Sequence, residues 1–318
     1  MSNELSRDDQ RINRLSSFLY WEGSIEAKII QPIKRNIYYI ETISGNKYVL
    51  KGHSNVINLK QQWDFFDSFH SKEIVPFVRY PNGKNEISTG TNYYWTISPY
   101  ITGRKLNYQS EVDRQRAVKT IKKFHTAASQ IYVHNMVKKS LFIKRWQARL
   151  YKFIETEQLF EKEGFLYLYH DIIFLMKRYL EIVSRYPWYK EQLHAETNGT
   201  WVHGDVASHN FIQNEKTYMI DFDLLQCTFQ DYDYIQLGQR FLPHINWDVE
   251  TLLSYKMVNE ESLERFLITV FIPSDMLREW LHFLTGKRRI SVESYLQTME
   301  QEWIKRKDFL NDSKRLLK

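Results

Sequence analysis

Residues 200–223 read TWVHGDVASHNFIQNEKTYMIDFD, and this stretch decides how the rest of the chain is interpreted. Two short apolar runs flank a polar turn at Asn214-Glu215-Lys216, a pattern that predicts a β-hairpin. Folding about Glu215 brings Asn210 and Asp221 opposite each other, roughly 5 Å apart. An amide oxygen and a carboxylate at that spacing suit Mg²⁺, which proteins hold with one or two oxygen ligands plus substrate phosphates.

An acidic residue lies on the loop that enters this hairpin. Asp205 stands five residues before Asn210, so its carboxylate can reach the same place as a general base. Two alternatives stay open at this point. Asp205 alone is more often a turn residue, and His203, Asp205 and His209 together offer the donor types of a metal-dependent hydrolase.

The hydrophobic period changes along the chain, from strand-like to helical. The first hundred residues favour strands: a hairpin at 37–42 and 47–51, then a second strand pair at 77–80 and 93–97, with an amphipathic helix at 56–69 between them. From Glu111 onward the period is helical, with long helices expected near 141–160 and 165–184 and from about Asp233 to the end. The sequence thus predicts an α+β fold, with a small β-rich lobe, a larger helical lobe and an embedded hairpin.

The composition narrows the class of protein. A net charge of +6 over 318 residues is too mild to indicate nucleic-acid binding. The single Cys227 excludes an intramolecular disulfide framework, which favours a reducing cytoplasm. The polar start of the chain does not resemble a signal peptide. The most apolar long stretch, 165–183, carries His170, Asp171, Lys177 and Arg178, so no membrane span is expected.

A base on a loop, an Asn four intervening residues later and an Asp after the following hairpin form a known arrangement in phosphoryl transfer. On His203-Gly204-Asp205, Asn210 and Ile220-Asp221-Phe222-Asp223, the chain resembles the aminoglycoside phosphotransferase and choline kinase superfamily, which has the protein-kinase-like fold. The His-Gly-Asp-Val-Ala form and the aromatic-rich helical half look most like the CotS-type spore-coat kinase-like proteins.

The resemblance implies a role for each matching residue. Asp205 would be the catalytic base, His203 would brace the loop, and Asn210 and Asp221 would bind Mg²⁺. Lys51 would neutralise the phosphates of ATP. Tyr100 and Ile101 would lie in the hinge beside adenine. The implied division is an N-terminal lobe of residues 1–101 and a C-terminal lobe of residues 102–318, the latter holding a catalytic loop at 203–210 and a metal loop at 221–223.

The chain departs from the superfamily pattern in two places. The segment Ile33-Lys34-Arg35-Asn36 has no glycine, so a Gly-rich phosphate loop is missing. The helix at 56–69 has no glutamate to pair with Lys51, and Gln61 and Gln62 stand where that partner is sought. These gaps keep a second hypothesis open: a kinase-like scaffold protein with little turnover, associated with proteins of the spore coat.

The acceptor is not identified by the sequence, although its charge is constrained. Residues 286–318 hold nine Lys or Arg against five Asp or Glu, which disfavours a polycationic aminoglycoside. A solvated helical face explains this excess most simply; a functional face would suit a sugar or an anionic metabolite. Trp201, Trp247, Trp280 and Trp303 are expected in the core rather than against a sugar ring.

Overall fold

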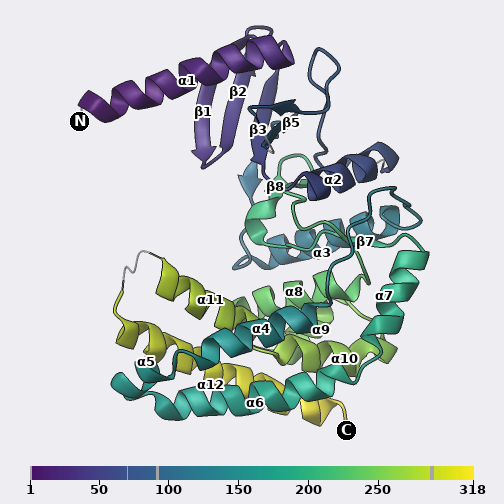
Figure 1. The fold of residues 1–318 in the computed structure, drawn as a ribbon. Helices are drawn as coiled ribbons and strands as arrows, with labels where there is room; N and C mark the ends of the chain where they lie inside the picture. The colour runs from purple at the N-terminus through teal and green to yellow at the C-terminus, as the bar shows by residue number, and fades with distance from the viewer. Residues whose placement is uncertain (1, 70, 91–92, 287–289) are drawn as a thin grey trace. The chain divides into compact units, whose positions relative to one another are not determined.

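The computed structural model describes residues 2–69, 71–90, 93–286 and 290–318 (Figure 1). The chain divides into two compact units that interleave along the sequence. The first unit comprises residues 1–105, 131–137 and 210–224, and the second comprises residues 106–130, 138–209 and 225–318. The expected lobes, 1–101 and 102–318, remain a prediction.

A five-stranded antiparallel sheet forms the centre of the first unit, with strand order β1-β2-β3-β5-β4. The strands are β1 (Ala27–Lys34), β2 (Ile37–Thr42), β3 (Lys47–His53), β4 (Ile87–Ser88) and β5 (Tyr94–Pro99). The predicted first hairpin is confirmed, because Tyr38 pairs with Leu50 and Ile37 pairs with Lys51. Tyr38 and Leu50 are buried. The alternation of β3 thus sends Leu50 into the core and Lys51 to the opposite face.

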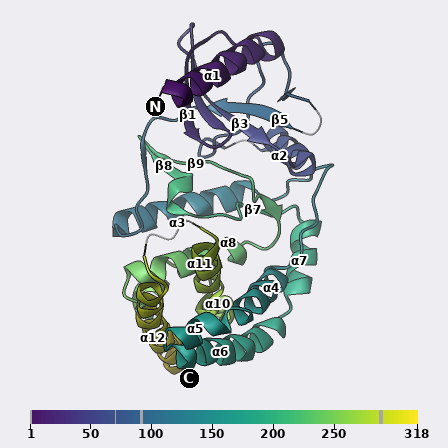
Figure 2. The ribbon, with the colours of Figure 1, turned by 60° about the vertical axis from the view of Figure 1, so that its left-hand side comes forward.

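Helix α1 (Ser2–Gly23) precedes the sheet and was not predicted. Its Leu15 and Leu19, four residues apart, lie on one helical face and join the core of the sheet with Ile40 and Ile97. Helix α2 (Val56–Ser68) was predicted, and Asn55 caps it by accepting a hydrogen bond from the backbone of Asn58. Figure 2 shows α1 running along the sheet.

The predicted strand pair 77–80 and 93–97 is wrong in part. β5 forms, but its partners are β3 and β4. The segment 77–80 contributes one bridge, in which Val78 donates to the Ile97 carbonyl. Prolines at positions 76 and 81 flank this segment, and a proline cannot donate to a ladder, so the pairing stays short.

The embedded hairpin is present, with a register one residue away from the prediction. β6 (Arg104–Lys105), β8 (Phe211–Gln213) and β9 (Thr217–Met219) form a small sheet of the first unit. Phe211 pairs with Met219, so Asn210 faces Ile220, whose amide donates to the Asn210 carbonyl at 3.0 Å. Asp221 therefore lies just past the paired region rather than opposite Asn210.

The second unit is mostly helical (Figures 1 and 2). Its elements are α3 (Glu111–Ala127), α4 (Phe142–Ile154), α5 (Glu157–Lys162), α6 (Leu166–Ser184), α7 (Trp188–Thr197), β7 (Trp201–Val202), β10 (Gln226–Cys227), α8 (Asp231–Phe241), α9 (Val249–Ser254), α10 (Glu260–Phe271), α11 (Ser274–Thr285) and α12 (Val292–Leu316). The single helix expected near 141–160 is divided into α4 and α5. Between them, the hydroxyl of Thr156 donates a hydrogen bond to the Phe153 carbonyl, which favours the end of α4.

Buried aromatic side chains fill the core of the second unit. Trp201, Trp247, Trp280 and Trp303 are all buried, as expected from the sequence. Cys227 is buried and free.

Within the described ranges, no helix is long and apolar enough to cross a membrane. Of the basic stretch 286–318, residues 287–289 lie outside the described residues.

Candidate active site

Lys51 is the centre of a charged cluster in the first unit. Its Nζ lies 2.6 Å from Oδ1 of Asp221 and 2.7 Å from Oδ1 of Asp223, and Nζ of Lys34 approaches Asp221 at 3.8 Å. The side chain of Lys51 is 16% exposed, whereas that of Asp223 is 48% exposed. The structure thus brings together two predicted site residues, Lys51 and Asp221, and adds Asp223.

The surroundings fix the charge of Lys51. Burial alone lowers the pKa of this amine, but the carboxylates of Asp221 and Asp223 outweigh burial and raise the pKa above its usual value. His53 lies two residues further along β3. Burial, followed by the charge of Lys51, lowers the pKa of His53 to about 4. The cluster therefore holds a charged lysine next to a neutral imidazole at pH 7.

The backbone at Asp221 explains why its carboxylate leaves the hairpin. Its φ is 67°, in the left-handed region that Asp tolerates better than most residues. Pairing ends at Ile220, and this turn directs the chain away from the ladder. Behind it, the ring of Phe222 packs edge-on against Phe66 of α2, with centroids 5.4 Å apart. The two carboxylates are thus placed by one strained residue and one buried ring.

The oxygen donors of this cluster fit Mg²⁺. Two carboxylates lie within 2.7 Å of one ammonium nitrogen, and Mg²⁺ usually takes one or two carboxylates and leaves its other positions to phosphates and water. Asn210 is buried. Across the part of the chain that the structure describes, no group of three His, Cys, Asp or Glu side chains is arranged to hold a metal. The hydrolase alternative required His203, Asp205 and His209 to form such a group, so the described residues give it no support.

The residues that the sequence offered as partners of Lys51 are used elsewhere. Gln61 of α2 accepts a hydrogen bond from the Val137 backbone at 2.6 Å. The amide nitrogen of Gln62 donates to the Asn58 carbonyl within the same helix. Glu73 lies next to β9, where its carbonyl accepts from Met219. Asp223, which follows the hairpin, supplies the second carboxylate partner of Lys51.

The predicted hinge residues follow directly after β5. Tyr100 donates its backbone N–H to the Lys47 carbonyl at 3.0 Å, and its ring packs edge-on against Tyr39. Ile101 is half-buried. Two residues on, a Cβ at Gly103 would lie 2.5 Å from the Gln213 carbonyl, so only glycine allows the chain to pass β8 this closely.

His203 and Asp205 belong to the second unit, on a loop that one buried carboxylate holds. Asp233 of α8 accepts the backbone N–H groups of His203 and Gly204, each at 2.9 Å, and contacts Nε2 of His125 at 3.0 Å. Asp233 is fully buried. Asp233 does not cap α8, because the residue before the helix is Gln230; Asp233 points from inside the helix into the loop.

Further contacts fix the same loop. Oδ1 of Asp205 accepts from Nη2 of Arg240 at 2.8 Å, and Nε2 of Gln236 donates to the Gly204 carbonyl at 3.1 Å. The hydroxyl of Tyr108 donates to the Val206 carbonyl at 2.7 Å. Nδ1 of His203 accepts a hydrogen bond from the backbone N–H of Asp205. This contact is consistent with the expectation that His203 braces the loop, which remains a proposal.

Sequence reasoning missed Asp233, Gln236 and Arg240 as a group. They follow one another at three- and four-residue steps, which places them on one face of α8. A polar stripe on an otherwise buried helix is the signal that could have found them. Their partners on the loop are about thirty residues away in sequence, so the pairing itself was not visible.

The comparisons with known proteins concern the fold. No family model and no curated protein matches the chain. Solved structures do match. An aminoglycoside phosphotransferase from Alicyclobacillus acidocaldarius shares 17% of its residues with this chain at a TM-score of 0.65, with 93% of this chain and 95% of that one covered. The chain has a kinase-like fold.

Two further neighbours support the same fold. An amicoumacin kinase in complex with AMP-PNP and Ca²⁺ is 13% identical, with a TM-score of 0.60 and coverage of 98% of this chain and 96% of that one. A choline kinase from Streptococcus pneumoniae is 12% identical, with a TM-score of 0.52 and coverage of 93% and 98%. The predicted α+β kinase-like fold is confirmed. Particular closeness to CotS-type proteins is not shown.

Proposed function

We propose that the chain is a phosphotransferase that moves the γ-phosphate of ATP to a hydroxyl group of a small molecule. The observation that carries this proposal is the charged cluster: in a kinase-like fold, Lys51 is charged and lies within 2.7 Å of two carboxylates. Phosphoryl transfer depends on positioning and charge neutralisation more than on covalent help from the protein. A lysine next to acidic oxygen donors provides that neutralisation.

Each predicted residue takes a part in this proposal. Lys51 binds the α- and β-phosphates once nucleotide competes with its carboxylates. Asp221 and Asn210 would hold Mg²⁺, which would neutralise charge on the phosphate oxygens. Tyr100 and Ile101 border the adenine. Because the backbone N–H of Tyr100 already donates to the Lys47 carbonyl, Ile101 would form the backbone hydrogen bond to adenine.

Asp205 accepts the proton of the acceptor hydroxyl. Its carboxylate is 32% exposed and is oriented by Arg240, so it is both accessible and fixed in direction. His203 holds the backbone of Asp205. This arrangement suits a base whose task is to orient a hydroxyl group for attack on the phosphorus.

The scaffold hypothesis rested on the missing Gly-rich loop and the missing helix glutamate. The two carboxylate partners of Lys51 support the phosphotransferase in spite of the second gap. Association with a spore coat has no support in the fold, and we do not propose it.

Calorimetric titration with ATP, with and without Mg²⁺, tests the proposal. We expect Mg²⁺-dependent binding by the unaltered protein and its loss in Asp221→Ala. Asp312→Ala is the matched control, because Asp312 is 52% exposed on α12 and pairs only locally, with Arg315. Absence of ATP binding in the unaltered protein would overturn the proposal.

A further inference from the structure

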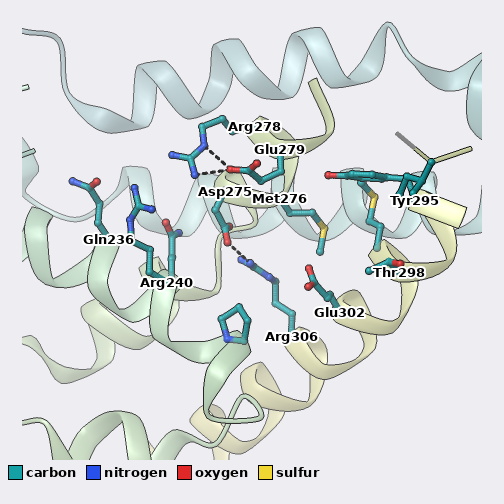
Figure 3. A pocket seen from close by; sticks show the side chains of 14 residues that line it. Gln236, Arg240, Asp275, Met276, Arg278, Glu279, Tyr295, Thr298, Glu302 and Arg306 are labelled. Atoms are coloured by element: carbon teal, nitrogen blue, oxygen red, sulfur yellow. Dashed lines mark hydrogen bonds and ion pairs between the residues drawn. The ribbon is translucent and has the colours of Figure 1, made fainter. Parts of the chain in front are cut away.

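A cavity of about 450 Å³ lies within the second unit, between α8, α11 and α12. Figure 3 shows Gln236 and Arg240 of α8 at one end and Tyr295 and Thr298 of α12 at the other, with Asp275, Arg306 and Glu302 between them. Small-molecule sites in proteins typically have volumes of roughly 300–1,000 Å³. The cavity is therefore large enough for a compound of one or two rings.

Two residues connect this cavity to Asp205. Arg240 lines the cavity and also donates to the Asp205 carboxylate at 2.8 Å. Gln236, one turn earlier, lines the cavity and donates to the Gly204 carbonyl at 3.1 Å. The same face of α8 thus holds the proposed base and forms a wall of the cavity. One arginine side chain, that of Arg240, thus separates the lining of the cavity from the carboxylate of Asp205.

The charges of the lining cancel. Three arginines (Arg240, Arg278 and Arg306) face three carboxylates (Asp275, Glu279 and Glu302). Each arginine has an acidic partner: Asp205, outside the lining, for Arg240 at 2.8 Å, Glu279 for Arg278 at 2.8 Å and Asp275 for Arg306 at 2.6 Å. The third carboxyl group of the lining, Glu302, is used in none of these pairs, and burial raises its pKa, which favours its neutral form. A polycation requires a net negative wall and an anion requires an arginine with spare charge. This lining offers neither.

What the lining does offer is a set of planar polar groups beside an apolar surface. Glutamine, arginine and carboxylate side chains can each donate or accept two hydrogen bonds. Met276, Met299 and Tyr295 supply the apolar part, and the ring of Tyr295 is held by stacking on Phe283 with centroids 4.2 Å apart. A molecule with many hydroxyl groups and apolar ring faces matches both kinds of surface.

We propose that this cavity is the acceptor site and that the acceptor is an uncharged polyhydroxylated compound, such as a sugar or a cyclic polyol. The proposal rests on the proposed function for the chemistry, in which an acceptor O–H transfers its proton to Asp205 while its oxygen forms a bond to the γ-phosphorus and ADP leaves. Binding to the cavity does not depend on that chemistry and is tested separately.

The test is saturation-transfer NMR of the full chain with a panel of neutral monosaccharides and inositols, with kanamycin as the polycation and glucose 6-phosphate as the anion. The key variant is Thr298→Trp, which fills the cavity from an exposed position on α12. Thr285→Trp, at an exposed position outside the lining, is the matched control. We expect neutral compounds to bind, and their binding to be lost in Thr298→Trp only.

The outcomes are separable from those of the ATP titration. Binding of kanamycin or glucose 6-phosphate in preference to every neutral compound would overturn the acceptor class. Absence of binding by any probe, or binding unchanged in Thr298→Trp, would overturn the cavity as the acceptor site. Either result leaves the proposed function standing if ATP binds. For turnover, a charged analogue is expected to lose about tenfold or more in kcat/KM, the equivalent of roughly 1.4 kcal/mol.

Discussion

The loop at 203–206 and the cluster around Lys51 are built in different ways. The loop is held by hydrogen bonds from buried side chains to its backbone, chiefly those of Asp233, with Gln236 and Tyr108 adding two more. The cluster consists of side-chain ion pairs at part-exposed positions. A ligand can therefore compete with the ion pairs of Lys51, whereas opening the loop exposes buried polar groups.

The largest effect is expected from breaking the loop. Asp233→Ala removes the acceptor of two buried backbone N–H groups and of His125. Because unpaired buried polar groups are costly, we expect the free energy of unfolding to fall by about 3–5 kcal/mol. Urea denaturation followed by circular dichroism measures this loss. The exposed control Asp312→Ala should change stability by less than about 0.5 kcal/mol, and equal effects of both changes would contradict the account.

Breaking the cluster should affect chemistry more than stability. Lys51→Met removes the positive charge proposed to face the phosphates and leaves Asp221 and Asp223 without it. We expect kcat to fall by about 10²–10³, as when one group that stabilises transition-state charge is lost. A phosphotransfer assay measures the rate, and thermal unfolding serves as the control. A kcat within a factor of two of the unaltered protein would remove Lys51 from the site.

A smaller change distinguishes the contribution of Asp223 to ATP binding from that of Asp221. Asp223→Asn leaves Asp221 in contact with Lys51, and the Asp223 side chain is half exposed. We expect ATP affinity to change by less than about tenfold, or 1.4 kcal/mol, because exposed ion pairs contribute little. Calorimetry on Asp223→Asn and Asp221→Ala compares them directly. A larger loss in Asp223→Asn than in Asp221→Ala would reverse the assignment of the metal ligand.

The smallest effect concerns Cys227, on β10 next to the strand that leads into the loop. Burial raises the pKa of its thiol from 9.0 to about 12. Because the folded state favours the neutral thiol, its contribution to stability is fully present below pH 9 and is lost as the pH rises through about 12. At pH 8 we expect the native thiol to resist a disulfide exchange reagent and to react after unfolding. Rapid native labelling would contradict its burial.

Local patterns allowed part of this structure to be predicted. The first hairpin, α2 and the helical half follow from hydrophobic period and turn residues. The kinase-like arrangement was recognised from Asp205, Asn210 and Asp221. These residues are close together in the sequence and lie on one loop and one hairpin. The predicted register was wrong by one residue because the turn is centred on Glu215, with Gln213 paired to Thr217, so that Asn210 lies opposite Ile220 rather than Asp221.

The remaining features depend on contacts between distant residues. The interaction of Lys51 with Asp221 joins positions 170 apart, and that of Arg240 with Asp205 joins positions 35 apart. Helix α1 was missed because strand-like segments dominated the first hundred residues, although Leu15 and Leu19 carried a helical spacing. The cavity between α8, α11 and α12 depends on how these helices pack against one another, which cannot be predicted from the sequence of any one of them.

The role proposed for Asp205 is tested by measuring the transfer of labelled phosphate from [γ-³²P]ATP to the acceptor in the unaltered protein, in Asp205→Asn and in the control Asp312→Asn. The account predicts that Asp205→Asn lowers the transfer rate by about 10²–10⁴, the usual contribution of a general base, while ATP binding and the control stay unchanged. Equal transfer rates in all three proteins would contradict it.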